Sequence, residues 1–325
     1  MKERMDFTRD AILDILKNNQ CVISSHEHLG IETLVFDNGF EHTYNQNIGG
    51  LFENLNNLDW IVIYRYLATV VTTMPHYSFS KDIMWKSNIT SGYGVYGFSN
   101  KELLASCYEW YVNNPQQIPL PFISIDINAS LNELRELIKR SIFPVMGFKV
   151  HPSARGVSIK ELARSDFFRF ASEMKLPILL HCARKGMAGD FEDIYLNLLN
   201  KAMEYDLTIC IAHAGFLDDK IKAIEKIGKI YVGISPWSII TDSVYSNDEL
   251  EFNVEKLENF INIFPDKILY GGDSPFDVQV WSTREKHGRG RNFDFMVLNK
   301  VIKKMGIYLA RKIFYDNPVG YLASR

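Results

Sequence analysis

The 325-residue sequence lacks any long apolar run. A membrane-spanning helix needs roughly 18 or more consecutive apolar residues. The nearest candidate, Trp60–Met74, is shorter and is interrupted by Arg65. The opening residues, MKERMDFTRD, also lack the apolar segment of a secretory signal. We therefore expect a cytoplasmic protein with no membrane partner.

An excess of charge of one sign is also missing, because 36 Lys and Arg residues oppose 39 Asp and Glu residues. A net charge of -3 provides no overall field to hold a polyanion, which argues against nucleic acid as a partner. Cysteine is scarce, and no CxxC pair occurs. The four cysteines, Cys21, Cys107, Cys182 and Cys210, thus indicate neither a disulfide framework nor a zinc ribbon.

Short β-branched or apolar segments alternate with amphipathic segments from about Leu120 onward, which is typical of repeated strand–helix units. The expected strands are residues 20–28, a segment within 67–74, 120–127, 144–150, 177–182, 207–214, 229–235 and 267–273. No glycine-rich nucleotide-binding motif follows the first strand. Eight strands without that motif predict a (β/α)8 TIM-like barrel, formed by residues 1–325 as a single domain.

Apolar residues at three- and four-residue spacing predict helices between these strands. The expected helices are residues 7–19, 51–66, 158–175, 191–206, 218–228 and 251–264. Two long polar and aromatic segments, Leu29–Gly50 and Pro75–Asn100, are interpreted as loops. Because each follows a strand, we expect them to form a lid over the carboxyl-terminal face of the barrel, where active sites lie.

Histidine and aspartate stand at the ends of several expected strands. His26 and His28 are two residues apart on the first strand, so their side chains point to the same face. Later strands end in His181, His213 and Asp273. The carboxyl ends of all strands meet around one axis in a barrel, and neutral imidazole is a common ligand of zinc. The pattern indicates a divalent metal site.

The ordered motifs HEH, GFKVHP, PILLHC, IAHAG and GGDSP resemble the amidohydrolase superfamily, in its amidohydrolase-related branch of metal-dependent TIM-barrel hydrolases. The resemblance extends from Ile23 to the NPVGYL segment near the carboxyl terminus. The family often has Asp two residues before the first histidine, and here that residue is Ser24. Jointly the motifs are fairly specific, although each one alone is not.

The resemblance implies metal ligation by His26, His28, His181 and Asp273, with Asp273 also accepting a proton. In relatives with one metal the residue at His213 orients water and substrate, and in relatives with two metals it is a ligand. The resemblance implies a divalent metal, with zinc the first choice and manganese or iron as alternatives. Such a cation lowers the pKa of bound water toward about 7 and so supplies hydroxide at neutral pH.

Lys149 and His151 are two residues apart at the end of the expected fourth strand. Relatives with two metals have a carboxylated lysine here that bridges the metals. The alternative is an unmodified lysine that pairs with a substrate anion or with Asp273. His151 either contacts the second metal or the substrate, or simply ends the strand, because Pro152 follows it.

Basic residues gather after the last expected strand, in the segment TREKHGRGR. Guanidinium groups bind carboxylate or phosphate through two parallel hydrogen bonds, so this segment is either an anion clamp or a solvated loop. The candidate substrate-binding residues are Arg184, Arg284, Arg289 and Arg291.

The sequence favours a metal-dependent hydrolase that acts on an amide, lactone or ester-like bond of a small-molecule substrate. If the basic segment is an anion clamp, that substrate is anionic. A metal-dependent non-oxidative decarboxylase or hydratase of the same superfamily is the alternative. A phosphoesterase and a non-catalytic binding barrel are weaker alternatives. Aromatic residues, at 13%, suit either a binding pocket or a homo-oligomer interface.

Overall fold

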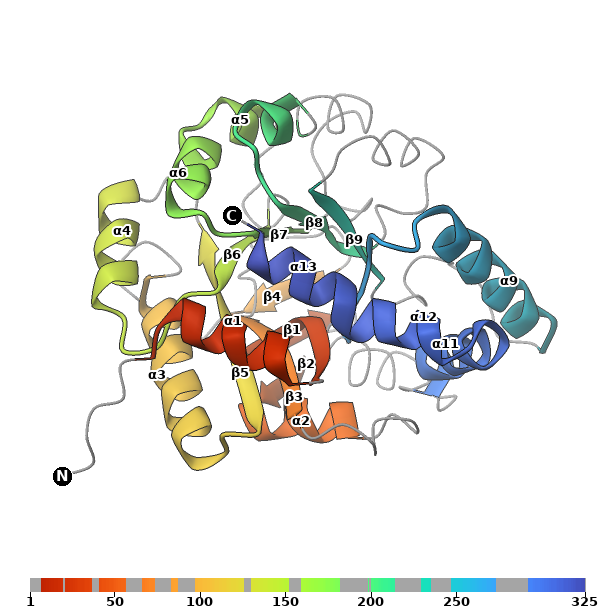
Figure 1. Ribbon diagram of the computed structural model, residues 1–325. Helices are drawn as coiled ribbons and strands as arrows, with labels where there is room; N and C mark the ends of the chain where they lie inside the picture. The colour runs from red at the N-terminus through yellow and green to blue at the C-terminus, as the bar shows by residue number, and fades with distance from the viewer. Residues whose placement is uncertain are drawn as a thin grey trace.

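Eight parallel strands form a nearly closed barrel with helices on its outside (Figure 1). The computed structural model describes residues 7–19, 21–36, 41–56, 66–73, 83–86, 97–125, 130–151, 159–181, 198, 200–213, 229–234, 247–272 and 292–324. Each neighbouring strand pair from β1 to β10 is parallel. The predicted (β/α)8 barrel is confirmed.

The barrel strands follow one another in chain order. They are β1 (Cys21–Phe36), β3 (Tyr66–Thr73), β5 (Gln117–Ile125), β6 (Gly147–Val150), β7 (Ile178–Leu180), β8 (Ile209–Ile211), β9 (Ile230–Ile234) and β10 (Ile268–Tyr270). Each of the eight expected strands has its counterpart here. The less distinct one, within 67–74, is β3, whose consecutive buried β-branched residues Thr69–Thr72 lie between β1 and β5.

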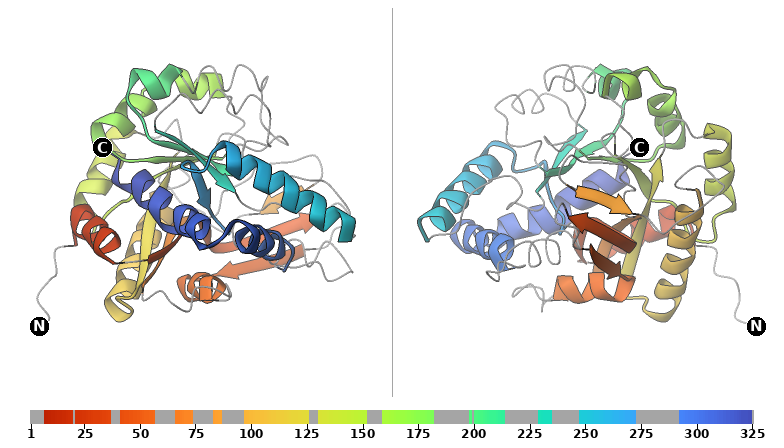
Figure 2. Two further views of the ribbon diagram at one scale, coloured as in Figure 1. Left: turned by 45° about the vertical axis from the view of Figure 1, so that its right-hand side comes forward. Right: turned by 180° about the vertical axis from the view of Figure 1, so that it is seen from behind.

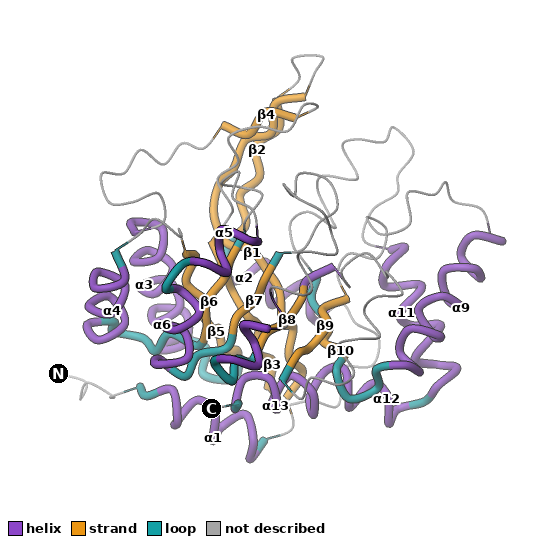
Figure 3. The backbone as a smooth tube through the Cα atoms, turned by 90° about the horizontal axis from the view of Figure 1, so that it is seen from above, coloured by secondary structure: helices purple, strands orange, loops and turns teal. Residues whose placement is uncertain are grey.

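The first strand extends beyond the barrel. Its second half pairs antiparallel with β2 (Glu41–Gln46) and β4 (Ile83–Lys86), which forms a projecting sheet past the carboxyl ends of the barrel strands (Figure 3). The prediction that Leu29–Gly50 and Pro75–Asn100 are loops is therefore wrong for residues 29–36, 41–46, 48–50, 83–86 and 97–100, which lie in strands or helices. Their backbone groups are instead partly satisfied by strand pairing. The segments 37–40, 75–82 and 87–96 lie outside the described residues.

Helices cover the outside of the barrel (Figures 1 and 2). They are α1 (Arg9–Asn18), α2 (Ile48–Asn56), α3 (Gly97–Asn113), α4 (Leu131–Arg140), α5 (Ile159–Arg164), α6 (Phe167–Met174), α9 (Asn247–Ile263), α11 (Asn292–Met305), α12 (Ile307–Arg311), the π-helical turn η6 (Lys312–Asp316) and α13 (Asn317–Ala323). In the described part of the chain, none of them is long and apolar enough to span a membrane.

The helix expected over 158–175 is divided into α5 and α6 at Ser165. The Ser165 hydroxyl donates to the Leu162 carbonyl at 2.7 Å and accepts the Phe167 amide at 3.4 Å. One side chain thus ends a helix and begins the next. Both helices bury apolar residues, so the chain changes direction at Ser165 while its apolar side chains stay buried.

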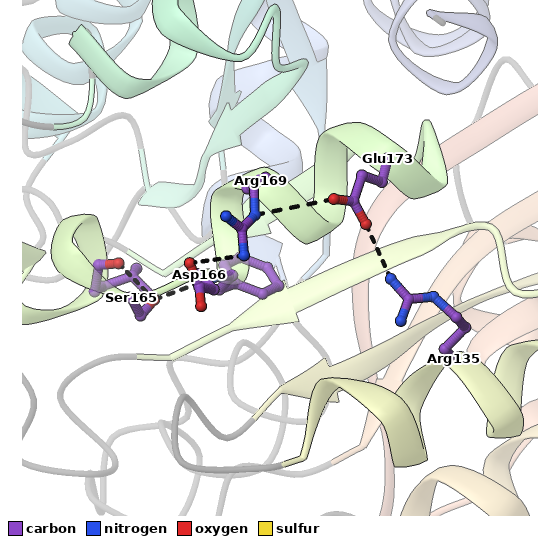
Figure 4. A network of polar contacts seen from close by, with 7 residues as sticks. Arg135, Ser165, Asp166, Arg169 and Glu173 are labelled. Carbon is purple, nitrogen blue, oxygen red and sulfur yellow. Dashed lines mark hydrogen bonds and ion pairs between the residues drawn. The ribbon is translucent and has the colours of Figure 1, made fainter.

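Helices α4 and α6 are also linked at the surface (Figure 4). Arg135 of α4 pairs with Glu173 of α6 at 2.9 Å, and Arg169 pairs with Asp166 at 3.1 Å and with Glu173 at 3.9 Å. Exposed ion pairs of this kind contribute about 0–1 kcal/mol each. Helix α6 is also packed onto the barrel, where Phe148 of β6 contacts Phe167 and Phe170 of α6 with ring centroids 5.6 and 5.7 Å apart.

The first and last helices, α1 and α13, pack together at the end of the barrel opposite the projecting sheet (Figure 3). Thr8 caps α1 by accepting the Ala11 amide at 3.1 Å, and the helix buries Ile12, Leu13 and Leu16. The Arg9 guanidinium donates to the carbonyl of Leu322 in α13. The opposite end of the barrel is thereby closed, which leaves the carboxyl-terminal face for function.

Candidate active site

Five histidines lie together at the carboxyl ends of the barrel strands. His26 and His28 belong to β1, His151 and His181 directly follow β6 and β7, and His213 follows β8 after Ala212. Ring centroids are 4.9 Å apart for His26 and His28, 5.5 Å for His26 and His213, and 4.7 Å for His181 and His213. The histidines among the predicted site residues are thus brought together from four different strands, whereas Asp273 lies outside the described residues.

An irregularity in β1 sets the direction of its histidines. Ser24 pairs with Thr69 and Glu27 pairs with Val71, so two residues of β1 stand opposite one residue of β3. Such a β-bulge turns the following side chains relative to the preceding ones. His26 and His28 share a face because they are two residues apart, and the bulge brings Ser24 and Glu27 close enough for a 2.6 Å hydrogen bond.

His28 is held by Thr72 of β3. The Thr72 hydroxyl lies 3.0 Å from His28 Nδ1 and 3.3 Å from the carbonyl oxygen of Glu27. A hydroxyl that donates to that carbonyl can accept from the ring nitrogen. Both residues are buried, so the contact fixes the orientation of the imidazole ring and leaves Nε2 directed elsewhere.

Lys149 enters the cluster from β6. Its Nζ lies 2.5 Å from His26 Nε2, and the residue is only 2% exposed. A buried lysine among histidines requires partners that offset its lost hydration. Its place beside His26 suits the second-metal or substrate role that the sequence predicts, and does not by itself decide between them.

His151, His181 and His213 form the other side of the cluster. The rings of His151 and His181 stack at 3.6 Å, and His213 Nε2 lies 3.0 Å from His181 Nδ1. His213 adopts φ of 59°, in the left-handed region that non-glycine residues seldom occupy. The strained backbone directs His213 toward His181, and such strain is typical of functional sites.

The cluster favours neutral imidazoles. Burial lowers the pKa of His26, His151 and His181 well below its ordinary value. The positive charge of Lys149 lowers the pKa of His26 and His151 further, as do the neighbouring histidines. A neutral imidazole keeps a lone pair, which is the form that binds a metal ion or accepts a proton.

Two glycines make room where β10 meets β1. A Cβ at Gly271 would lie 2.5 Å from His26 Cβ and 2.9 Å from the His26 nitrogen. A Cβ at Gly272 would lie 2.6 Å from Oε1 of Glu27. A larger residue at Gly271 would push the end of β10 away from β1, and one at Gly272 would displace the carboxylate of Glu27.

The donor set suits a borderline divalent cation. Two imidazoles that bind one zinc ion at about 2.1 Å with tetrahedral geometry place their ring centroids about 5 Å apart, close to the spacings described above. In the described part of the chain, however, no three His, Cys, Asp or Glu side chains are gathered to hold an ion. In this arrangement His26 Nε2 lies 2.5 Å from Lys149 Nζ.

Several predicted site residues lie outside the described residues. They are Asp273, Arg184, Arg284, Arg289 and Arg291. Their roles as metal ligand, proton acceptor and anion-binding residues stay predictions. The structure adds Glu27, Thr72 and Ser24, which the sequence reasoning gave no role in the site. Their only sequence signal is a polar side chain on a strand that is otherwise buried.

The barrel and the cluster at its carboxyl-terminal face define the class of protein, a (β/α)8 barrel with a polar site of the kind enzymes use. A family model described as Amidohydrolase matches residues 110–319, which is more than half of the chain. The chain belongs to the amidohydrolase family, and it is therefore an enzyme by fold and family. The family is generally metal-dependent.

Solved structures share the fold at low identity. A probable 2-pyrone-4,6-dicarboxylic acid hydrolase from Acinetobacter baumannii, with citric acid bound, has a TM-score of 0.59 at 12% identity over 93% of this chain and 98% of that one. Dihydroorotase from Saccharomyces cerevisiae, in complex with 5-fluoroorotic acid, has a TM-score of 0.56 at 13% identity, over 94% of this chain and 84% of that one. Metarhizium anisopliae IDCase in apo form has a TM-score of 0.52 at 13% identity, over 94% of this chain and 97% of that one. No curated protein matches the sequence.

Proposed function

We propose that the protein is a metal-dependent hydrolase that acts on an amide, lactone or ester-like bond of a small carboxylate-bearing substrate. The observation that supports this proposal is the convergence of five histidines and Lys149 at the carboxyl ends of the barrel strands. These residues come from four strands of an amidohydrolase-family barrel.

His26, His28 and His181 would hold the cation, together with Asp273. The cation, with zinc as the first choice, would polarise the substrate carbonyl and lower the pKa of a bound water. Thr72 orients His28 through its Nδ1, so that Nε2 is presented to the site. His213 lies within hydrogen-bond distance of His181 and would orient the substrate or its attacking water. Asp273 would accept the proton released from that water.

A carboxylate is the substrate group that Lys149 suits. Its ammonium group is buried at the site, where one anionic group of a ligand would offset the buried charge. Two of the similar structures, the dicarboxylic acid hydrolase and the dihydroorotase, have carboxylic acids bound. A carboxylated substrate also suits a decarboxylase, so the reaction products have to separate the two activities.

The decisive experiment combines metal content with product analysis. Metal per chain is measured by elemental analysis for the wild type, for a His26→Ala/His28→Ala variant and for His42→Ala, a histidine of β2. We expect about one equivalent in the wild type and in His42→Ala, and loss in the double variant. Metal content equal in all three proteins, or absent from all, would contradict the proposal.

The loaded wild type is then assayed on carboxylate-bearing lactones, cyclic amides and esters, and separately on aromatic carboxylic acids. Ring opening or ester cleavage that disappears in the double variant supports hydrolysis. Release of carbon dioxide from an acid without hydrolysis of any lactone, amide or ester would instead assign the decarboxylase activity. If the metal-loaded protein shows neither activity, the remaining explanation is a barrel that only binds a ligand, and the proposal is overturned.

A further inference from the structure

The barrel closes between β10 and β1 through side chains. In the described ranges no backbone ladder joins these two strands, although their residues are in contact. Instead the Ser25 hydroxyl donates to the Tyr270 carbonyl at 2.5 Å, and Glu27 accepts the amide of Gly272 at 2.9 Å. This seam is the place where the strand of His26 and His28 meets the strand that precedes Asp273.

Glu27 is the charged group of the seam. Its residue is 3% exposed, and its Oε1 accepts the Ser24 hydroxyl at 2.6 Å as well as the Gly272 amide. A buried carboxylate is unfavourable unless hydrogen bonds replace its hydration, and bonds to an ionised acceptor are the stronger kind. Glu27 is therefore fixed between its own strand and the end of β10.

The position of Glu27 couples two parts of the proposed site. It stands between His26 and His28 in the chain and on the opposite side of the strand, because successive strand residues alternate faces. The bulge after Ser24 places Glu27 on the same side as Ser24. Its partner Gly272 directly precedes Asp273 in the sequence. Gly272 has no side chain, and a Cβ there would collide with Oε1 at 2.6 Å, so the amide can approach the carboxylate closely.

We propose that Glu27 is a positioning residue that fixes the end of β10 at a set distance from His26, and so sets how the histidines of β1 are presented to the proposed cation. This inference rests on the proposed metal-dependent function. A positioning role depends on where the Glu27 oxygen lies and does not depend on the negative charge. A role for the charge would depend on the negative charge and tolerate a shift of the oxygen.

Two substitutions separate position from charge. Glu27→Gln keeps an oxygen where Oε1 lies, which still accepts from Ser24 and Gly272, but removes the charge. Glu27→Asp keeps the charge but withdraws the oxygen by one methylene. Glu27→Ala removes both. Ser25→Ala serves as the control, because it breaks a seam hydrogen bond to Tyr270 without touching the Gly272 amide.

Zinc affinity is measured by competition with a chromophoric chelator on the full chain, after urea unfolding has established that each variant folds. Loss of a residue that orients ligands typically lowers metal affinity by about 10–100-fold. We expect that loss for Glu27→Asp and Glu27→Ala, and a change of about 3-fold or less for Glu27→Gln and Ser25→Ala. If Glu27→Ala fails to fold, the Asp and Gln variants decide the question.

A second readout does not depend on metal. Hydrogen exchange of a peptide spanning residues 268–272 should become faster in Glu27→Asp and stay at the wild-type rate in Glu27→Gln. Loss of zinc affinity in Glu27→Gln, with affinity retained in Glu27→Asp, would overturn the inference. Wild-type zinc affinity in every variant would also overturn it, as would a loss in Ser25→Ala equal to that in Glu27→Asp. A wild type that binds no zinc overturns the proposed function, and the exchange rates alone then decide whether Glu27 holds Gly272.

Discussion

At the scale of single residues, Gly271 should be intolerant of any side chain. Alanine there would place its Cβ 2.5 Å from His26 Cβ and 2.9 Å from the His26 nitrogen, and backbone atoms cannot move aside as the end of a side chain can. We expect Gly271→Ala to lower the free energy of unfolding by about 1–3 kcal/mol, the usual effect of overpacking. Urea unfolding measures this change.

Gly233→Ala is the matched control on the neighbouring strand. Its added Cβ would come no closer than 3.3 Å, to Cys210 Sγ, where a small shift of the side chain suffices. Its free energy of unfolding should stay within about 0.5 kcal/mol of the wild type, because the strain is small. Equal effects of the two alanines would show that the close approach of Gly271 to His26 has no special consequence.

Thr72 tests whether the orientation of His28 matters. Thr72→Val keeps the shape of the side chain but removes the hydroxyl that contacts His28 Nδ1 and the Glu27 carbonyl. Stability should fall by about 1–3 kcal/mol, because buried polar groups lose a partner. Zinc affinity should fall by about 10–100-fold, because the ring is no longer held by its second nitrogen.

Thr72→Ser provides the control for this prediction. Serine restores the hydroxyl and removes only a methyl group, so zinc affinity measured by chelator competition should recover most of its value. Should serine bind zinc as weakly as valine does, packing of the methyl group, and not the hydrogen bond to His28, would be responsible.

Sequence reasoning identified the histidines of the site because both their type and their place at strand ends were visible. It could not identify Glu27 or Thr72 as part of the site. Glu27 depends on a bulge and on a backbone amide 245 residues away, and neither leaves a local pattern. Ser24 illustrates the same limit, because the residue stands out from the family pattern but its bond to Glu27 follows only from the fold.

At the scale of elements, the barrel strands could be predicted since each combines apolar residues with a polar end. The projecting sheet could not. Residues 31–36, IETLVF, do carry β-forming side chains. However, β1 is 16 residues long, whereas strands are usually about 5–6 residues, so strand length alone predicts that β1 ends soon after the histidines.

The side chain of Asn100 joins helix α3 to strand β5, and loss of this side chain should destabilise the protein. Its side-chain amide donates to the Ser124 carbonyl and accepts the Ser124 amide, both at 2.9 Å. Strand β3 pairs with β5 only as far as Pro121, so Asn100 takes the place of a strand partner. Asn100→Ala should lower the free energy of unfolding by about 1–3 kcal/mol for each group left unsatisfied.

Asn113→Ala on the same helix is the control. Its amide donates to the Glu109 carbonyl at 2.9 Å in an exposed position, where water replaces the lost bond. Urea unfolding should show a change within about 0.5 kcal/mol. A similarly small change for Asn100→Ala would mean that Ser124 finds other partners and that α3 does not depend on this link.

At the scale of the whole molecule, the site histidines make the stability of the metal-free protein depend on pH. Burial lowers the pKa of His26, His151 and His181 in the folded chain, whereas unfolding returns each imidazole to its ordinary pKa of about 6.5. Below that pH the unfolded state therefore binds more protons than the folded state does. Stability is fully present above about pH 6.5 and is lost as the pH falls, by about 1.4 kcal/mol per pH unit for each histidine.

Urea unfolding in the presence of a chelator, at several values between about pH 5.5 and 7.5, measures this slope. A His26→Gln/His151→Gln/His181→Gln variant carries no titrating group at these positions, so its free energy of unfolding should change less over the same range. Zinc should raise the stability of the wild type most at the upper end, because its ligands bind in the deprotonated form. A wild-type profile no steeper than that of the variant would show that the folded chain accepts these protons, and that the cluster is not held neutral.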